Sequence, residues 1–360
     1  MNRPSQLALL ALPWMAPQPA TAQDWALMRE ITPRGYVASR ADEPVQVDGR
    51  LDEPAWRAAP WSDGFVDIEG SRKPLPHLET RMKILWDDRY LYLGARLEEP
   101  HIWGTLTEKN SVIFHDNDFE IFIDPDGDHH NYYELEINAL GTIWELALVK
   151  PYRDGGPVIS PANIDGLRSA VHVEGTLNDA SDADTAWSVE VAIPWSGLAQ
   201  YATDPVPPRH GEQWRMNFSR VQWQHTIRQD AYRKVPDTPE NNWVWSPQGV
   251  VNMHCPERWG YVQFSTARPG TDRFVADPTL AGRDLLMDVY YAQQAYRRKH
   301  GSWARSLGDL QLLAERHPSL VLEADADGFT ASLVVEPAQG PVRMLEINHE
   351  SQIVTRFADR

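Results

Sequence analysis

Stretches of alternating apolar and polar residues follow one another through residues 45–264 and predict β-strands. Residues 80–86 and 90–97 flank the turn-forming residues 87–89, which is typical of a β-hairpin. Because no helical periodicity separates these strands, we expect a mainly β protein built on an antiparallel β-sandwich. The other expected strands are residues 119–124, 132–138, 142–149, 169–174, 186–193, 214–223 and 260–264.

The pattern changes after a linker, residues 265–279, which contains two prolines and a glycine. Apolar residues then recur at intervals of four, three and four, which predicts a helix that ends near Gly301. Alternating strands are expected afterwards, so residues 280–360 should form a small α+β domain. The apolar helix positions are Leu285, Val289, Ala292 and Tyr296, and the later strands are residues 320–323, 329–335 and 342–348.

The N-terminus has the three parts of a secretory signal peptide. Residues 1–3 are short and basic, residues 7–12 are apolar, and residues 20–22 (Ala-Thr-Ala) match the small-x-small cleavage pattern. We therefore expect residues 1–22 to be removed, so that an exported, periplasmic or extracellular protein begins at Gln23. The apolar run is too short to span a bilayer, which predicts no membrane insertion. The single cysteine, Cys255, excludes an intramolecular disulfide.

Charge limits the classes of partner. The chain has 360 residues and a net charge of −17, which repels nucleic acid and anionic lipid. Its 42% hydrophobic content and 24% charged content are those of a folded protein. The 15 tryptophans, 28 prolines and 22 glycines indicate short strands, many turns and a preference for flat ligands.

Five separated blocks resemble the family 9 carbohydrate-binding modules in order and spacing. The resemblance spans residues 45–264 and implies a β-sandwich that binds sugar ends between aromatic side chains without catalysis. Residues 290–303 resemble the globular part of type IV pilins or pseudopilins, which suggests that the second domain packs on or docks a protein partner. The five blocks are VDGRLDEPAW (47–56), LWDDRYLYL (85–93), DFEIFID (118–124), WSVEVAIPW (187–195) and PERWG (256–260).

The resemblance also implies which residues contact the sugar. One aromatic wall of the family's site corresponds to Phe114, and the strand glutamate that hydrogen-bonds sugar hydroxyls corresponds to Glu120. A basic residue on the next strand corresponds to Glu136, which reverses its charge, and the second aromatic wall falls near Met253 and His254. These departures imply a ligand other than the reducing ends of ordinary xylo- or gluco-oligosaccharides.

Strand geometry places polar residues on one face without reference to the family. Side chains two residues apart share a face, so the alternation in residues 119–124, 132–138 and 214–223 separates a polar face from an apolar one. Arg220 points away from the polar face. The strand residues proposed to bind the ligand are Glu120, Glu134, Glu136, Asn138, Asn217 and Ser219.

The opposite face of the same strands is the expected core. It carries large apolar side chains at every second position, and most tryptophans of a sandwich are expected there as well. The expected core residues are Phe119, Ile121, Ile123, Leu135, Ile137, Met216, Phe218, Trp56, Trp86, Trp187, Trp195 and Trp259.

Two further features complete the candidate site. Trp223, at the end of the polar face, and Trp243, expected in a loop, are candidates for stacking on a sugar. Asp124, Asp126 and Asp128 alternate carboxylates in a turn, so they are candidate Ca²⁺ ligands, with a plain turn as the alternative.

These observations favour non-catalytic carbohydrate binding by an exported protein, linked to polysaccharide degradation or uptake. A glycan or oligosaccharide is the expected partner. Two alternatives stay open. Glu120, Glu134 or Glu136 could serve as acid and base in a glycoside hydrolase or lyase, because neighbouring strands can hold two carboxylates at the required separation. The chain could instead be an envelope scaffold whose second domain docks a partner.

Overall fold

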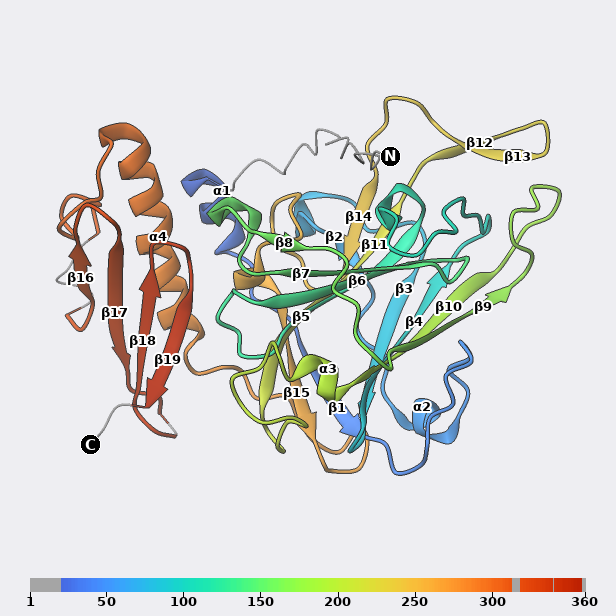
Figure 1. Ribbon diagram of the computed structural model, residues 1–360, viewed down its shortest axis with the longest axis horizontal. Helices are drawn as coiled ribbons and strands as arrows, with labels where there is room; N and C mark the ends of the chain where they lie inside the picture. Colours follow the sequence, from blue (N-terminus) through green and yellow to red (C-terminus); the bar gives the residue numbers. More distant parts are fainter. Residues whose placement is uncertain (1–20, 313–317, 339, 358–360) are drawn as a thin grey trace, which may run out of the picture.

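The computed structural model describes residues 21–312, 318–338 and 340–357. Within these ranges the chain forms a large β-sandwich with a small sheet and a long helix at one end (Figure 1). Apart from Thr21 and Ala22, the expected signal peptide lies outside the described residues. No helix in the described ranges is both long enough and apolar enough to cross a membrane.

One continuous sheet makes up the sandwich. Its strands are β1 (Gly35–Arg40), β2 (Val66–Asp67), β3 (Thr80–Trp86), β4 (Tyr90–Glu98), β5 (Asp118–Asp124), β6 (Tyr132–Asn138), β7 (Ile143–Leu148), β8 (Val158–Ile159), β9 (Arg168–Glu174), β10 (Ala186–Pro194), β11 (Gln213–Gln222), β14 (Asn241–Val244) and β15 (Gly260–Ser265). They follow the order β8-β7-β6-β5-β11-β15-β1-β3-β4-β10-β9, and β14 pairs with β11 and β2. The sheet curls, so that the β5–β6–β11 half and the β3–β4–β10 half enclose a shared core.

The strand β1 corrects the expectation of a purely antiparallel sandwich. It pairs in parallel with β15 (Gly35 opposite Tyr261) and with β3 (Ser39 opposite Leu85), and so joins the two halves. The alternation pattern could not show this, because β1 is far from both partners in the sequence and no hairpin sets its direction. The remaining strand pairs of this sheet are antiparallel.

The expected core residues of β5, β6 and β11 lie in the main core, which confirms the assignment of the faces of these strands. Trp56 and Trp259 are buried as well, but in two smaller clusters outside the main core. Phe119, Ile121 and Ile123 of β5 pack with Met216 and Phe218 of β11 in the main core. Arg220 points to the same side as this core, as expected, where its guanidinium reaches Glu99 at 3.0 Å. The five tryptophans expected in the core, at 0–4% exposure, are Trp56, Trp86, Trp187, Trp195 and Trp259.

The alternation pattern missed several short elements. Figure 1 shows β12 and β13 projecting from the sandwich as a separate hairpin. A short helix, α3 (Trp195–Leu198), follows β10 directly. The missed strands are β1, β2, β8, β12 (His225–Arg228), β13 (Ala231–Lys234), β14 and, in the C-terminal region, β19 (Ile353–Phe357). The missed helices are α1 (Ala22–Met28), α2 (Pro54–Ala58) and the short 3-10 helices η1 (Gly70–Arg72), η2 (Ile113–His115), η3 (Tyr152–Asp154) and η4 (Pro256–Arg258).

The C-terminal region is a helix packed on a four-stranded antiparallel sheet, in agreement with the expected α+β pattern. The helix α4 (Leu280–His300) ends as expected at Gly301, whose left-handed φ of 74° suits a residue without a side chain. The sheet strands are β16 (Val321–Ala324), β17 (Phe329–Val335), β18 (Arg343–Asn348) and β19 (Ile353–Phe357).

The core of this second domain also includes α1, from the other end of the chain. Trp25 stacks on Tyr291 of α4 with ring centroids 5.2 Å apart, and its Nε1 donates a hydrogen bond to Asp288 at 2.7 Å. Cys255, which follows the sandwich strand β14, is buried in the same cluster. The division into domains of residues 23–264 and 280–360 therefore stays a prediction. α1 and Cys255 belong to the first domain by sequence but are buried in the core of the second.

Buried polar contacts join the two domains around η3 and η4. Arg153 donates to Glu257 at 2.9 Å and to the hydroxyl of Ser351 at 3.2 Å. The hydroxyl of Tyr291 donates to the same Glu257 oxygen at 2.7 Å, and Ser351 in turn donates to Asp154 at 2.6 Å. The side chains of Arg153 and Glu257 are both 2% exposed, so their charges neutralise each other away from water.

Candidate ligand-binding site

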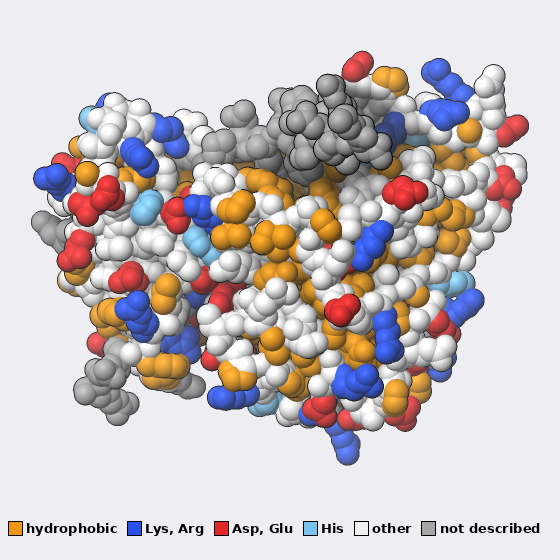
Figure 2. Space-filling view, in the orientation of Figure 1, with side chains coloured by type: hydrophobic (Ala, Val, Ile, Leu, Met, Phe, Trp, Pro, Cys, Tyr) orange, Lys and Arg blue, Asp and Glu red, His pale blue; other side chains and the backbone are white. Residues whose placement is uncertain are grey.

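The acidic residues of the candidate site lie inside the protein. On the face shown in Figure 2, acidic and basic side chains are intermingled, and hydrophobic side chains gather over the region of β7 and β8. By contrast, Asp118 is 0%, Glu120 5%, Glu134 3% and Glu136 2% exposed. The predicted polar face exists, but other parts of the protein cover it and shield it from solvent.

The strand register sets four side chains in one row across β11, β5, β6 and β7. Ser219 lies opposite Glu120, Glu120 opposite Glu136, and Glu136 opposite Trp144. Residues that face each other in this way point to the same side of the sheet, and Asp118 joins them because it is two residues before Glu120. One carboxylate oxygen from each of Asp118, Glu120 and Glu136 lies within 4.8 Å of the others.

Burial makes these carboxyl groups weaker acids than exposed carboxyl groups are. It raises the pKa of Glu120 to about 7. Burial, reinforced by the charge of Glu120, raises the pKa of Asp118, Glu134 and Glu136 well above the usual range. Like charges this close together in a medium of low polarity cannot all ionise, so the cluster must hold protons or a cation.

Aromatic side chains cover another part of the same face. His254 belongs to this cover: its Nδ1 is 3.0 Å from the hydroxyl of Tyr132, and its ring meets that of Tyr152 edge-on at 4.5 Å. Burial lowers the pKa of His254 to about 3, so the ring is neutral at physiological pH. The buried apolar members of the cover are Ile68, Ile113, Phe122, Tyr132, Trp144, Leu146, Leu148, Val244, Met253 and Trp259.

The two asparagines of the candidate site are engaged in holding loops. Asn138 donates to the carbonyl of Leu106 and to Asp116, and its amide oxygen accepts from two further backbone N–H groups. Asn217 donates to the carbonyl of Ser246 at 2.9 Å and accepts from the N–H of the same residue at 3.0 Å. Both side chains are fully buried, so their hydrogen-bonding capacity is used within the protein.

Trp223 and Phe114 come together nearer the surface, as the sequence predicted for two ligand contacts. The Trp223 Nε1 donates to the carbonyl of Phe114 at 2.8 Å, and its backbone N–H donates to Asn117 at 2.8 Å. Both rings are half-buried, and the neighbouring His115 is exposed. The Nζ of Lys234, on β13, lies 3.6 Å from the centre of the Trp223 ring. These residues form the mouth of the site, a name used below for Phe114, His115, Trp223 and Lys234.

Trp243 lies elsewhere, and its expected position in a loop was wrong. It sits on β14, opposite Arg220 of β11 and Asp67 of β2, and is 4% exposed in the main core. The guanidinium of Arg220 lies 5.2 Å from its ring. Strand pairing with distant segments, which the polar sequence before Trp243 concealed, accounts for this placement.

The candidate calcium residues form a compact turn. Asp124 accepts hydrogen bonds from the N–H groups of Gly127 and His129, and Asp128 accepts from the N–H of His130. The second oxygen of Asp128 accepts from Gln352 of the C-terminal domain at 2.7 Å. Oxygens of Asp124, Asp126 and Asp128 lie within 4.8 Å of one another, so a cation could be held there, in a turn that also contacts the second domain.

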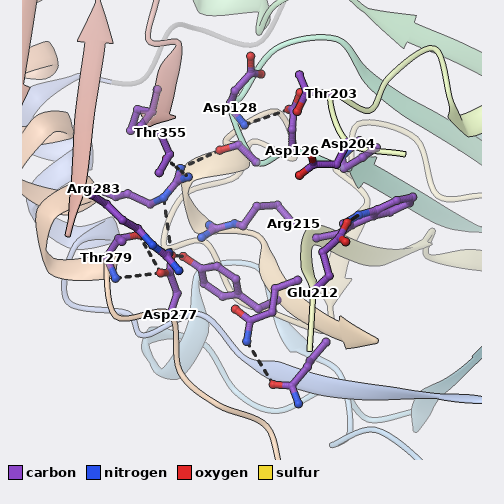
Figure 3. Close-up of a pocket in the computed structure, with 18 of the residues that line it drawn as sticks. Asp126, Asp128, Thr203, Asp204, Glu212, Arg215, Asp277, Thr279, Arg283 and Thr355 are labelled. Carbon is purple, nitrogen blue, oxygen red and sulfur yellow. Dashed lines mark hydrogen bonds and ion pairs between the residues drawn. The ribbon is translucent and has the colours of Figure 1, made fainter. Parts of the chain in front are cut away.

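Beside this turn, a groove of about 870 Å³ lies between the two domains. Figure 3 shows Arg215 extending across it and Arg283 of α4 close to Asp277 and Thr355. Arg283 donates to the carbonyl of Gly127 at 2.7 Å and approaches Asp277 at 3.6 Å. The groove is polar and mixed in charge. Arg283 joins the domains across it, whereas Arg215 donates to the carbonyl of Pro256 within the sandwich.

Comparison with known proteins decides the family. A family model described as "Carbohydrate family 9 binding domain-like" matches residues 47–247. The chain belongs to this family. The resemblance expected from the five sequence blocks is confirmed, and it identifies a non-catalytic carbohydrate-binding protein rather than a hydrolase or lyase.

Three solved structures show low similarity to this chain. A family 9 module from Caldicellulosiruptor kristjanssonii in complex with cellotriose is 14% identical, with 68% of this chain and 100% of that chain covered and a TM-score of 0.41. The same kind of module in complex with glucose is 16% identical, with the same coverage and TM-score. A protein from Bacteroides uniformis is 16% identical over 65% of this chain and 100% of that chain, with a TM-score of 0.48. A search of curated proteins found no match.

Sequence reasoning missed two residues of the candidate site. Asp118 was noted in a motif but not placed in the site, although its position two residues before Glu120 puts it on the same face. Lys234 lies on the overlooked hairpin. The signal for that hairpin was present, because Gln229 and Asp230 form a two-residue turn with φ values of 53° and 55° between alternating segments.

Proposed function

We propose that this family 9 protein binds its carbohydrate at the mouth, above the buried carboxylates. The anchored, half-buried ring of Trp223 carries the proposal, since its two hydrogen bonds, to Phe114 and Asn117, hold it in place near the surface. The C–H faces of a sugar stack on such rings. Lys234 and His115 supply donors for its hydroxyl groups.

In this proposal the strand carboxylates act beneath the ligand rather than beside it. Glu120, Glu134 and Glu136 are at most 5% exposed, so a sugar that rests on Trp223 reaches them only through the side chains of the mouth. The charges of Asp116, Glu240 and Asp118 favour the ammonium form of Lys234. This arrangement explains why a basic residue of the family's site can be a glutamate here: the positive charge comes from β13 instead.

A titration with two matched tryptophan variants tests the site. Trp223→Ala is expected to lower affinity about tenfold or more for a glycan identified on an array, because stacking and its buried area are lost. Trp61→Ala is the control, since Trp61 is also partly exposed and also has a lysine, Lys83, over its ring at 4.3 Å. Melting curves check that both variants are folded.

The outcomes separate the possible sites. Loss of binding in Trp61→Ala with full binding in Trp223→Ala would move the site to the small groove of about 270 Å³ beside Trp61. Unchanged affinity in both variants would refute the mouth as well. The glycan should be recovered intact, and new reducing ends in the mixture would contradict a non-catalytic role.

We further propose that the protein is exported and takes part in polysaccharide degradation or uptake, with the C-terminal domain docking a protein partner. The basic, apolar and small-x-small segments of residues 1–22 support export. Exported protein is expected to begin at Gln23, which intact-mass measurement checks. Retention of Met1 in exported material would contradict the prediction.

A further inference from the structure

A buried arginine in the groove between the two domains has no counter-charge. Arg215 is 4% exposed and lines the groove, and Figure 3 shows its side chain extending across it. Within the described residues its guanidinium forms no ion pair, and its Nη2 donates one hydrogen bond, to the carbonyl of Pro256 at 2.9 Å. Its Nε is buried and has no hydrogen-bond partner there. A buried cation in this state is unfavourable, so the groove favours an anionic group beside Arg215.

Asp124 is the carboxyl group opposite Arg215 in the strand register, but it does not supply that anion. Its two oxygens accept hydrogen bonds from the N–H groups of Gly127 at 2.9 Å and His129 at 3.0 Å. Burial raises the pKa of Asp124 well above the usual range even with Arg215 nearby, so this carboxyl group resists ionisation. The charge of Arg215 therefore remains open to a partner from outside the protein.

Further positive charge lies close to Arg215. Burial lowers the pKa of Arg215, and the charges of Arg283 and Arg258 act in the same direction. Asp277 acts the other way, but it already approaches Arg283 at 3.6 Å. Arg343, on β18 of the second domain, lines the same groove, and its Nε is buried without a hydrogen-bond partner in the described structure. Both domains thus contribute positive charge to the groove.

Carboxylates line the other side of the groove. Figure 3 shows Asp126, Asp204 and Glu212 on the side opposite Arg283. An ionised carboxylate accepts several hydrogen bonds and donates none, so this side suits the hydroxyl groups of a ligand. It would repel a ligand with negative charge at both ends. The groove therefore matches a molecule that carries one carboxylate at one end and hydroxyl groups at the other.

We propose that the groove binds a sugar acid, with its carboxylate on Arg215 and its hydroxyl groups on Asp204 and Glu212. A guanidinium holds a carboxylate through two parallel hydrogen bonds, and the free Nε of Arg215 is a donor for one of them. The ring of Tyr261, with its centre 4.1 Å from the guanidinium carbon, holds the guanidinium in place. The four residues of the mouth are not among the described residues that line the groove, so this second site stands whether or not a carbohydrate binds at the mouth.

Calorimetric titration of the full protein with glucuronate at pH 7.5 tests the proposal, with glucose and succinate as comparisons. The wild type is expected to bind glucuronate most tightly, because glucose lacks the carboxylate and succinate carries two carboxylates and no hydroxyl group. Arg215→Met should weaken glucuronate binding by about tenfold or more, since charge-assisted hydrogen bonds are lost. Arg89→Met is the control and should bind as the wild type does: Arg89 also lies over a tyrosine ring, 5.3 Å from the centre of Tyr90, but outside the groove.

Melting curves separate a binding residue from a structural one. Arg215→Met removes an unpaired buried charge, and the carbonyl of Pro256 keeps its hydrogen bond from the N–H of Trp259 at 3.2 Å, so the melting temperature without ligand should not fall. Arg215→Lys is the second variant. It keeps the charge and should fold as the wild type does, but it loses the paired donors and should also bind glucuronate more weakly.

Three results would overturn the proposal. The first is no binding of glucuronate by the wild type at millimolar concentration, and the second is equally tight binding of glucose or succinate. The third is unchanged glucuronate binding in both folded Arg215 variants. If binding is instead lost in Trp223→Ala and kept in Arg215→Met, glucuronate binds at the mouth, which rejects the groove and leaves the proposed function intact.

Discussion

Arg153→Met is expected to lower the free energy of unfolding by about 3–5 kcal/mol, because it leaves the buried carboxylate of Glu257 without its ion-pair partner. Glu257→Gln should cost less, because Arg153 keeps Asp154 at 3.4 Å. Both side chains are 2% exposed, so water cannot compensate for the loss. The same Glu257 oxygen accepts from Tyr291 of α4, so the interface between the domains should weaken as well. Urea unfolding followed by tryptophan fluorescence and by far-ultraviolet circular dichroism measures both effects.

An exposed ion pair in the same chain shows how much of the expected loss of stability comes from burial of the pair. Arg96 and Glu174 form a two-pronged ion pair at 3.0 and 2.9 Å, but their side chains are 38% and 37% exposed. Glu174→Gln should therefore cost about 1 kcal/mol or less. The double variant Arg153→Met with Glu257→Leu should recover only part of the stability lost by Arg153→Met. The charge of Glu257 is then gone, but the buried Asp154, 3.4 Å from Arg153, still lacks its partner. Equal effects in Glu257→Gln and Glu174→Gln would contradict the account.

The protein is expected to lose stability as pH rises above 7. The pKa values of Asp118, Glu134 and Glu136 are raised well above normal in the fold, by burial and by each other's charge. In this range the folded protein therefore holds more protons than the unfolded chain, and stability falls as pH rises. Each proton so retained contributes about 1.4 kcal/mol per pH unit.

Other groups set the limits of this window. Glu120, with a pKa of about 7, contributes only at its lower edge. The buried histidines act below it: the pKa of His254 is lowered to about 3 and that of His129 well below normal, so acid destabilises the fold as these residues protonate on unfolding. The charged groups near the cluster that act on it are Asp116, Lys234 and Glu240.

Glu136→Gln isolates the contribution of the cluster. It keeps the shape of the side chain and the oxygen that accepts from the N–H of Phe114. Without one titrating carboxyl, the decline in stability between pH 7 and 9 should be shallower, by up to about 1.4 kcal/mol per pH unit. Glu108→Gln, in an exposed loop, should leave the slope of the wild type. Urea unfolding in EDTA across this range supplies the slopes, and a flat wild-type profile would refute the prediction.

Local alternation located the faces of the strands, because its period of two depends on neighbouring residues alone. Glu120 and Glu136 are on one side and Phe119 and Ile137 on the other, as the sequence indicated. The same reasoning could not show that the polar face is covered. Part of its cover, such as Trp259, comes from segments more distant along the chain than any hairpin.

The role of the asparagines illustrates a second limit. A polar residue on a ligand-facing strand is a candidate contact until its partners are known. The loops that occupy Asn138 and Asn217 end near them only in the folded chain, through Leu106 and Ser246. Trp243 likewise became a core residue through pairing with β2, which is two residues long and has no pattern of its own.

The placement of β1 has a consequence for how the protein forms. β1 is the first strand of the sandwich to be synthesised and β15 the last, yet they pair directly along Gly35–Ser39. The two halves of the sheet therefore cannot be joined until nearly the whole sandwich has emerged. Contacts this distant in sequence slow folding, because the entropy of closing the loop is lost before the pairing is gained. A chain destined for export would benefit, since it stays open, and able to cross a membrane as an extended polypeptide, until its last strand arrives.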